Sequence, residues 1–143
     1  MNLINNLHVF ITHKKEIKKM RKKILIIDDK DEFRALTKTI LLSKYDVEAA
    51  VNGIHALSIL QSGYLPDLII TDLTMPILGG KDFLEQLKNS GAFKDIPVFI
   101  LSSIVKSDEK IKLINMGAND YLEKPYNPAE LMARIENVFK TLR

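Results

Sequence analysis

The chain has 143 residues, 46% of them hydrophobic and 27% charged, which is the size and balance of one folded domain with its own core. It contains no cysteine, which excludes a disulfide scaffold, a thiol catalyst and a cysteine-ligated zinc or iron–sulfur site. The longest aliphatic runs span only a few residues, whereas a membrane-spanning helix needs about 20 apolar residues. The three histidines, at positions 8, 13 and 55, do not have the spacing of metal ligands.

The net charge of +3 is unevenly distributed along the chain. Residues 1–23 hold seven cations and one anion, net +6, whereas the other 120 residues hold fourteen cations and seventeen anions, net −3. We favour a solvated basic lead-in over a segment that touches nucleic acid or an acidic membrane surface. In this segment the apolar residues precede the cations, which is the reverse of their order in a secretory signal peptide.

Five short apolar runs predict five strands, at residues 24–27, 47–51, 68–71, 98–101 and 121–122. The first run is apolar at consecutive positions, which is typical of a strand buried on both faces, whereas the second alternates in part and is expected at an edge. Apolar residues at helical spacing follow each run. Gly63 and Gly117 are predicted to end the second and fourth of these helices.

Polar residues mark two helix starts. Ser107, followed by Asp108 and Glu109, is predicted to cap the fourth of these helices, and Asn127 followed by Pro128 is predicted to cap the last. Parallel strands need crossover connections, so the alternation predicts a doubly wound α/β fold, a five-stranded parallel sheet with helices on both faces. In open sheets of this kind, ligands bind beyond the carboxyl ends of the strands.

Charged and hydroxyl side chains follow four of the predicted strands at that edge. They are Asp28 and Asp29 after the first strand, Asp72 after the third, Ser102 and Ser103 after the fourth, and Lys124 after the fifth. Any one of them is ordinary where a strand meets solvent, but all four positions together indicate a site. Carboxylates about 4 Å apart repel by roughly 4 kcal/mol at an effective dielectric near 20, so they raise one another's pKa unless a cation neutralises them.

Mg²⁺ is the cation that oxygen ligands of this kind suit, because it takes one or two carboxylates together with waters and phosphate oxygens. An ionised aspartate beside Mg²⁺ and a lysine can act as a nucleophile toward phosphorus and form an aspartyl phosphate. The lysine, a hydroxyl and the metal would then each hold one phosphoryl oxygen.

Four segments carry a family resemblance: residues 24–29 (ILIIDD), 67–76 (DLIITDLTMP), 97–102 (PVFILS) and 117–125 (GANDYLEKP). In this order and spacing they resemble the receiver domain of two-component response regulators of the chemotaxis-regulator size, over about residues 22–143. The resemblance implies a flavodoxin-like sheet with the strand order 2-1-3-4-5. It also implies a phosphorylation-activated signalling switch, and not an enzyme that turns over an external substrate.

The resemblance implies roles for individual residues. Asp72 would be the phosphoacceptor, Lys124 would bind the phosphoryl group, Ser102 would be the switch hydroxyl and Tyr121 the switch aromatic. The Mg²⁺ ligands would be Asp29 and Asp72 directly, Asp28 through water, and the backbone carbonyl of Thr74. The Lys124–Pro125 bond is expected to be cis.

The sequence departs from the family pattern at two positions. Gly79 stands where the family usually has aspartate or asparagine, which removes the side chain that would cap the following helix and predicts a looser loop. Serine at position 102 replaces the commoner threonine but keeps the hydroxyl.

The resemblance also implies partners and a location. The phosphodonor would be a sensor histidine kinase, a histidine phosphotransfer protein or a small phosphodonor, in the cytoplasm, and no direct binding of nucleic acid is expected. The signal would pass to a protein target through the face made by the helix with Lys106, Lys110 and Lys112, the last strand and the last helix, where Ile104 and Val105 are expected to be exposed. Dimerisation through that face or through the N-terminal segment is an open alternative.

Two other functions fit parts of the pattern. Phosphatases that form an aspartyl phosphate need a second aspartate two residues after the nucleophile as general acid, and Thr74 cannot take that role. A receiver that is never phosphorylated is disfavoured because every site residue is present. The sequence leaves open whether the chain acts alone or belongs to a larger regulator.

Residues 1–19 lie outside the family pattern, so the domains are predicted as a basic N-terminal extension, 1–19, and a receiver domain, 20–143. Leu3, Leu7 and Phe10 fall on one helical stripe, whereas Asn5 and Asn6 are poor helix formers. We expect this extension to be partly helical or flexible, and ordered only where its stripe finds another surface.

Overall fold

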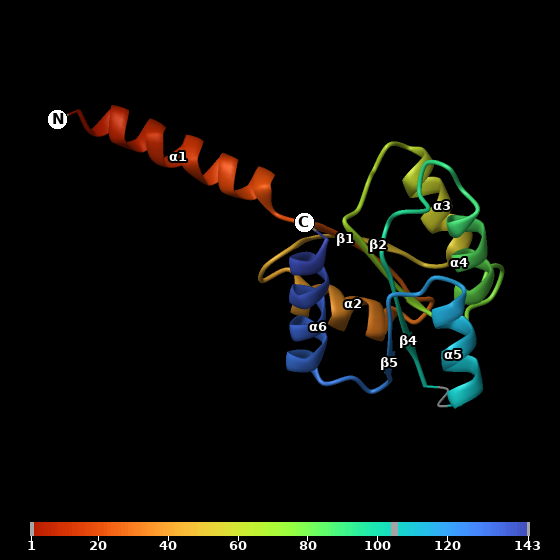
Figure 1. Cartoon of the computed structure of the whole chain (residues 1–143). Helices are drawn as coiled ribbons and strands as arrows, with labels where there is room; N and C mark the ends of the chain where they lie inside the picture. Colours follow the sequence, from red (N-terminus) through yellow and green to blue (C-terminus); the bar gives the residue numbers. More distant parts are fainter. Residues whose placement is uncertain (1, 104–105, 143) are drawn as a thin grey trace.

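The computed structural model describes residues 2–103 and 106–142, and Ile104 and Val105 therefore lie outside the described residues. The described chain folds as a series of helices and strands (Figure 1). In order they are α1 (Leu3–Met20), β1 (Lys23–Ile27), α2 (Asp31–Leu41), β2 (Asp46–Ala50), α3 (Gly53–Gln61), β3 (Leu68–Asp72), α4 (Gly80–Lys88), β4 (Val98–Ser102), α5 (Ser107–Asn115), β5 (Asp120–Glu123) and α6 (Pro128–Thr141).

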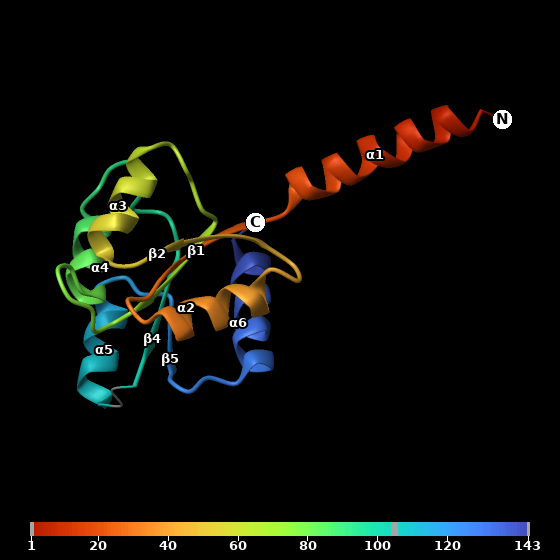
Figure 2. The ribbon, with the colours of Figure 1, turned by 180° about the vertical axis from the view of Figure 1, so that it is seen from behind.

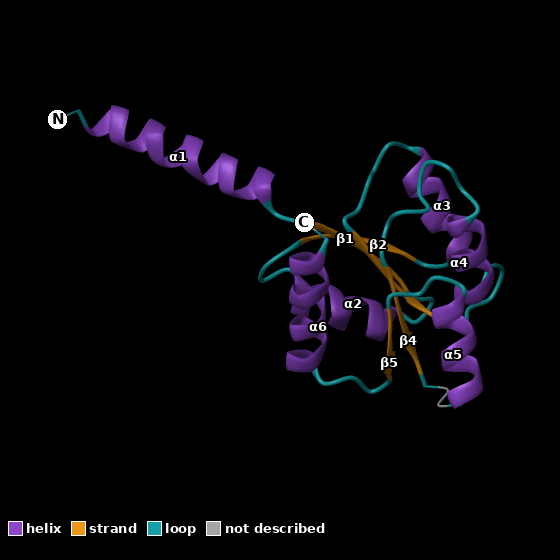
Figure 3. Ribbon diagram, viewed as in Figure 1, coloured by secondary structure: helices purple, strands orange, loops and turns teal. Residues whose placement is uncertain are grey.

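The strands form one parallel sheet with the order β2-β1-β3-β4-β5, which confirms the predicted fold and places β2 at an edge (Figure 3). The register pairs Ile27 with Thr71 and Asp72 with Leu101. The ends of β1, β3 and β4 therefore lie level at one edge of the sheet.

Each face of the sheet carries its own core. Helices α3, α4 and α5 cover one face and α2 and α6 cover the other, as the opposite views in Figures 1 and 2 show. Every residue of β3 and β4 is buried, because both faces are covered and an uninterrupted apolar run suits such a position. The largest fully buried side chains include Leu25, Phe83 and Leu84 on the first face and Ile24, Phe99 and Leu41 on the second.

Of the two predicted helix caps, one is confirmed and one is wrong. Asn127 caps α6 by accepting hydrogen bonds from the backbone N–H groups of Ala129 and Glu130, as predicted. The predicted cap at Ser107 is wrong, because Ser107 is the first helical residue and Lys106 occupies the cap position without a side-chain hydrogen bond. Asp108 and Glu109 in the first turn of α5 stabilise this N-terminus through the helix dipole, in place of a hydrogen bond from a cap side chain.

Helix α1 extends away from the sheet in Figure 1. It is continuous from Leu3 to Met20, so the asparagines near its start do not interrupt it, and Leu3, Leu7 and Phe10 are exposed. None of the described helices is long and apolar enough to cross a membrane. The guanidinium of Arg21 donates to the carbonyl oxygens of Leu42 and Tyr45, at 2.6 and 3.1 Å. The domain division at residue 20 stays a prediction.

Gly80 allows α4 to start directly against the end of β3. A Cβ at this position would collide with the carbonyl oxygen of Asp72 and would lie 3.0 Å from the Cα of Leu73. Gly79, at the cap, has no side chain to bond the helix start, and a Cβ there would lie 3.2 Å from the carbonyl oxygen of Leu73. The close approach of α4 thus fixes the backbone that carries Asp72.

We expect Gly80→Ala to lower the free energy of unfolding by about 1–3 kcal/mol, the usual cost of an overpacked contact, because α4 must move away from β3. Urea unfolding measures the change. Gly91→Ala is the matched control, since a Cβ at Gly91 meets nothing within 4 Å, and it should stay within about 0.5 kcal/mol of the parent chain. Equal stabilities for the two variants would contradict the steric argument.

Candidate functional site

The parallel strands bring three carboxylates together at the edge predicted from the sequence. Asp28 and Asp29 follow β1, and Asp72 is the last residue of β3. Each can place one oxygen within 4.8 Å of the others. The side chains of Asp28 and Asp72 are 10% and 8% exposed, so solvent screens their mutual repulsion poorly.

The ammonium group of Lys124 neutralises part of this charge. Its Nζ lies 2.7 Å from Oδ2 of Asp28 and 3.5 Å from Oδ1 of Asp72, and the lysine side chain is only 7% exposed. The backbone N–H of Lys124 donates to the carbonyl oxygen of Ser102 at 2.9 Å, which fixes the segment after β5 to the end of β4. The Lys124–Pro125 bond is cis, as predicted.

The first turn of α2 holds Asp28 in place. The backbone N–H of Lys30 donates to Oδ1 of Asp28 at 3.0 Å, and the guanidinium of Arg34 donates to the backbone oxygen of Asp28 at 2.9 Å. Both carboxylate oxygens of Asp28 therefore accept hydrogen bonds, one from Lys30 and one from Lys124.

Burial raises the pKa of Asp72 above its ordinary value. The Lys124 ammonium opposes this rise, the charge of Asp28 adds to it, and a hydrogen bond from the backbone N–H of Leu73 to Oδ1 of Asp72 partly offsets it. Burial, together with the charge of Asp28, therefore outweighs the stabilisation of the Asp72 carboxylate by Lys124 and by the Leu73 N–H.

The carboxylates present fit a hard divalent cation. Oδ1 of Asp29 is buried and has no hydrogen-bond partner among the described residues, which is costly for a carboxylate oxygen unless a cation or water meets it. Asp28 differs, because both of its oxygens are already engaged. Asp29 thus has an oxygen free for a cation, and the expected ligation of Mg²⁺ by Asp29 directly and by Asp28 through water stays a prediction.

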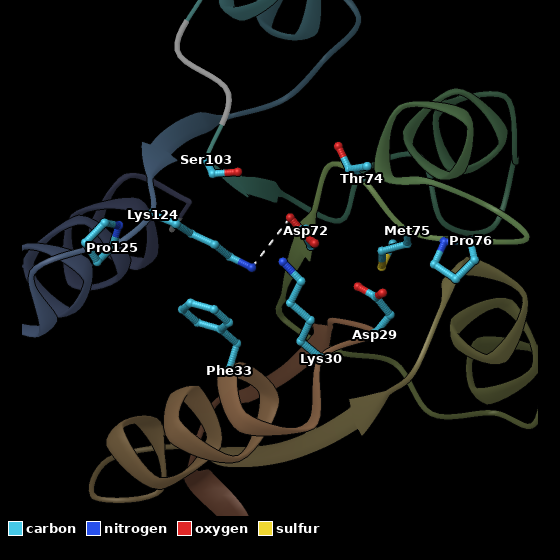
Figure 4. Close-up of a pocket in the computed structure, with 10 residues that line it drawn as sticks. All are labelled: Asp29, Lys30, Phe33, Asp72, Thr74, Met75, Pro76, Ser103, Lys124 and Pro125. Carbon is cyan, nitrogen blue, oxygen red and sulfur yellow. Dashed lines mark ion pairs between the residues drawn. The ribbon is translucent and has the colours of Figure 1, made fainter.

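A cavity of about 600 Å³ opens beside Asp29 and Asp72 and is drawn in Figure 4. Its lining includes the predicted residues Asp29, Asp72, Thr74 and Lys124. It also includes Ser103, which the sequence analysis placed at this edge, and Lys30 and Phe33, to which it gave no role. Phe33 lies in the first turn of α2, and no pattern in the sequence links it to the site carboxylates.

The two predicted switch residues lie deeper than the cavity wall. Ser102 is 1% exposed at the end of β4. Tyr121 is buried against the core formed with α3, α4 and α5, and the ammonium of Lys110 lies 5.4 Å from the centre of its ring. Their roles stay predictions.

Comparison with known proteins adds independent evidence. Residues 24–136 match the family model described as the response regulator receiver domain. The chain belongs to this family. Receiver domains are signalling domains and not turnover enzymes on external substrates, so the predicted class is confirmed.

Two solved structures show the same architecture. The Francisella response regulator 1452 receiver domain is 30% identical with a TM-score of 0.78, and the match covers 85% of this chain and 99% of that one. The chemotaxis response regulator CheY4 of Vibrio cholerae is 29% identical with a TM-score of 0.77, covering 83% and 99%.

Longer proteins contain similar sequences. The chain is 36% identical over 121 residues to the probable transcriptional regulator ycf27 of Porphyridium aerugineum, which covers 84% of this chain and 49% of that protein. It is 36% identical over 118 residues to the sensor histidine kinase TmoS of Ectopseudomonas mendocina, covering 81% of this chain and 12% of the kinase. The chain therefore spans about half of the length of the first of these relatives and about an eighth of the length of the second.

We expect Asp72→Asn to raise the midpoint of thermal unfolding by a few degrees at pH 7 in Mg²⁺-free buffer, because it removes a charge that the folded state disfavours. The gain should be full above the raised folded-state pKa of Asp72. It should vanish as the pH falls through the ordinary aspartate pKa of 3.8, since the carboxyl is then protonated in both states.

Calorimetry from pH 3 to pH 8 tests this dependence. Asp95→Asn, which removes an exposed carboxylate, is the matched control and should change the midpoint little. A lower midpoint for Asp72→Asn at pH 7 would show that its pairing with Lys124 outweighs the burial of its charge.

Proposed function

We propose that this receiver domain is a switch that accepts a phosphoryl group on Asp72. The observation that carries the proposal is the Lys124 ammonium, which contacts both Asp28 and Asp72 above a cluster of three carboxylates. This arrangement offers a nucleophile and a cation for the incoming phosphoryl oxygens at one cavity.

In the proposed step, a carboxylate oxygen of Asp72 attacks phosphorus and forms an O–P bond. The P–N bond of a phosphohistidine breaks, its electron pair stays on the imidazole nitrogen, and that nitrogen later takes a proton from solvent. With acetyl phosphate, the P–O bond breaks and acetate leaves. Lys124 holds one phosphoryl oxygen during transfer.

Asp29, Asp72 and the Thr74 carbonyl would hold Mg²⁺, with Asp28 acting through water. When bound, the ion supplies positive charge that neutralises the carboxylates and the phosphoryl oxygens. Water would later hydrolyse the acyl phosphate, release inorganic phosphate and restore the Asp72 carboxylate. The domain would assist this hydrolysis of its own phosphoryl group and act on no external substrate.

The relay part of the proposal uses Ser102 and Tyr121. The Ser102 hydroxyl would turn toward a phosphoryl oxygen, and the Tyr121 ring would move into the space that it leaves, as a population shift between two states. The backbone hydrogen bond from Lys124 to Ser102 supports this, because it joins the phosphoryl-binding lysine to the switch hydroxyl's residue. The output face would be α5, β5 and α6.

The proposed donor is a sensor histidine kinase or a histidine phosphotransfer protein, and the proposed target is another protein and not nucleic acid. Similarity to a sensor histidine kinase and to transcriptional regulators supports a place in two-component signalling. Residues 1–19 are proposed as an extension outside the switch, because the domain contacts of Arg21 begin after them.

The first test is labelling of Asp72. Incubation with acetyl phosphate and Mg²⁺ should add one phosphoryl group, measured by intact-protein mass spectrometry. Asp72→Asn should abolish the added mass, whereas Asp95→Asn should retain it. Labelling that persists in Asp72→Asn, or that proceeds equally with excess chelator, would contradict the proposal. A parent chain that never labels would favour a receiver that is not phosphorylated.

The second test separates phosphorylation from relay. Ser102→Ala should still be labelled on Asp72 but should lose at least half of the phosphorylation-dependent amide shift changes over α5, β5 and α6, measured by NMR. Ser58→Ala, which removes an exposed hydroxyl on α3, is the matched control and should keep them. Full shift changes in Ser102→Ala would count against the switch role of its hydroxyl.

A further inference from the structure

The aromatic ring of Phe33 lies against the ammonium group of Lys124. The lysine Nζ is 4.5 Å from the ring centroid, and the two side chains line the same cavity (Figure 4). We propose that Phe33 is a positioning residue whose ring face holds the Lys124 ammonium in line with Asp72 for phosphoryl transfer. This inference rests on the proposed function.

The surroundings of the ammonium leave one side for the ring. Lys124 has three N–H donors, and its two carboxylate contacts, with Asp28 at 2.7 Å and Asp72 at 3.5 Å, differ in closeness. The shorter contact draws the ammonium toward Asp28 and away from the nucleophile. A ring face attracts a cation electrostatically, and more strongly where water is excluded, as it is around a side chain that is 7% exposed.

The ring is carried by a helix that is tied to the site. It belongs to the first turn of α2, which is fixed to the site by the hydrogen bond from Arg34 to the backbone oxygen of Asp28. Further along the same helix, the hydroxyl groups of Thr37 and Tyr126 lie 2.7 Å apart in a hydrogen bond. Tyr126 is two residues after Lys124, so α2 is joined to both sides of the ion pair and sets the distance from the ring to the ammonium.

Phosphoryl transfer requires the lysine to change partners. The Asp72 carboxylate becomes an acyl phosphate, so the ammonium has to leave a carboxylate oxygen and meet a phosphoryl oxygen. Attraction to a ring face has no preferred acceptor atom, so the ammonium can slide over the ring without losing it. A hydrogen-bonding side chain in the same place would compete with the phosphoryl group.

A second lysine approaches the same ring. Nζ of Lys30 is 5.9 Å from the ring centroid, at the margin of a cation–π contact, and its side chain is exposed. The nearer, buried ammonium of Lys124 is therefore the one on which the ring acts most strongly. The competing interpretation is that Phe33 is only an apolar wall, which any side chain of similar shape could provide.

Fluorinated phenylalanines separate these interpretations, because each added fluorine weakens the negative ring face and changes the shape little. The rate of Asp72 phosphorylation by acetyl phosphate at saturating Mg²⁺ should fall stepwise through mono-, tri- and pentafluorophenylalanine at position 33. Phe33→Leu should be roughly fivefold slower, and Phe33→Tyr should keep the parent rate within about twofold. The Mg²⁺ affinity should change little.

The same analogues at Phe93, a partly buried ring packed against the core, are the matched control and should leave the rate unchanged. A flat fluorination series at position 33 would overturn the proposal. So would a loss in Phe33→Leu together with unchanged fluorinated variants, because the ring would then act through its shape.

The contact has a readout that needs no phosphorylation. In the unphosphorylated chain, the Cε protons of Lys124, assigned with Lys124→Arg, should show an upfield ring-current shift in NMR spectra that disappears in Phe33→Leu. A missing shift would refute the contact whatever the kinetics. A present shift in a parent chain that never labels would refute the proposed function, and the positioning role with it, while leaving the contact established.

Discussion

The site depends on one ammonium group placed between buried carboxylates. Two carboxylates that are at most one-tenth exposed repel each other strongly, and Lys124 is the cation that contacts both of them. Its own burial would be unfavourable without them. The ion pairs therefore fix the relative positions of the segment after β5 and the ends of β1 and β3. Loss of the charge of Lys124 would leave the two buried carboxylates uncompensated.

The backbone prepares this placement before any side chain acts. Parallel pairing in register brings the ends of β1, β3 and β4 to one edge, and the N–H of Lys124 extends the pairing by bonding to Ser102. At β3 the contact of Gly80 with the Asp72 backbone brings α4 close. In an antiparallel sheet, only alternate strands would end at this edge. The all-parallel topology is therefore itself a requirement of the site.

Much of this arrangement could be predicted from the sequence, because the strands are aliphatic runs. The carboxyl ends of parallel strands meet at one edge, so the residues that follow these runs are expected to lie together. Asp28, Asp29, Asp72 and Lys124 were found in this way. Phe33 was missed because its role depends on where α2 begins and on the direction of a lysine four strands away, neither of which has a local pattern. Ser107 was misassigned because a cap depends on a single backbone conformation. Ile77 adopts a positive φ of 74° that its β-branched side chain gave no reason to expect.

The charge balance of the site explains why it can respond to a ligand. Three carboxylates face one buried ammonium, an oxygen of Asp29 has no hydrogen-bond partner among the described side chains, and burial raises the pKa of Asp72. A fully neutralised cluster would be more stable but would have little to gain from a further cation or from conversion of a carboxylate. The incomplete compensation lowers stability locally, and in the proposed switch it is the reason that a change of charge at Asp72 would be felt by Lys124. Helix α2 contacts both the backbone of Asp28 and Tyr126, two residues after Lys124, so this helix joins the two sides of the ion pair.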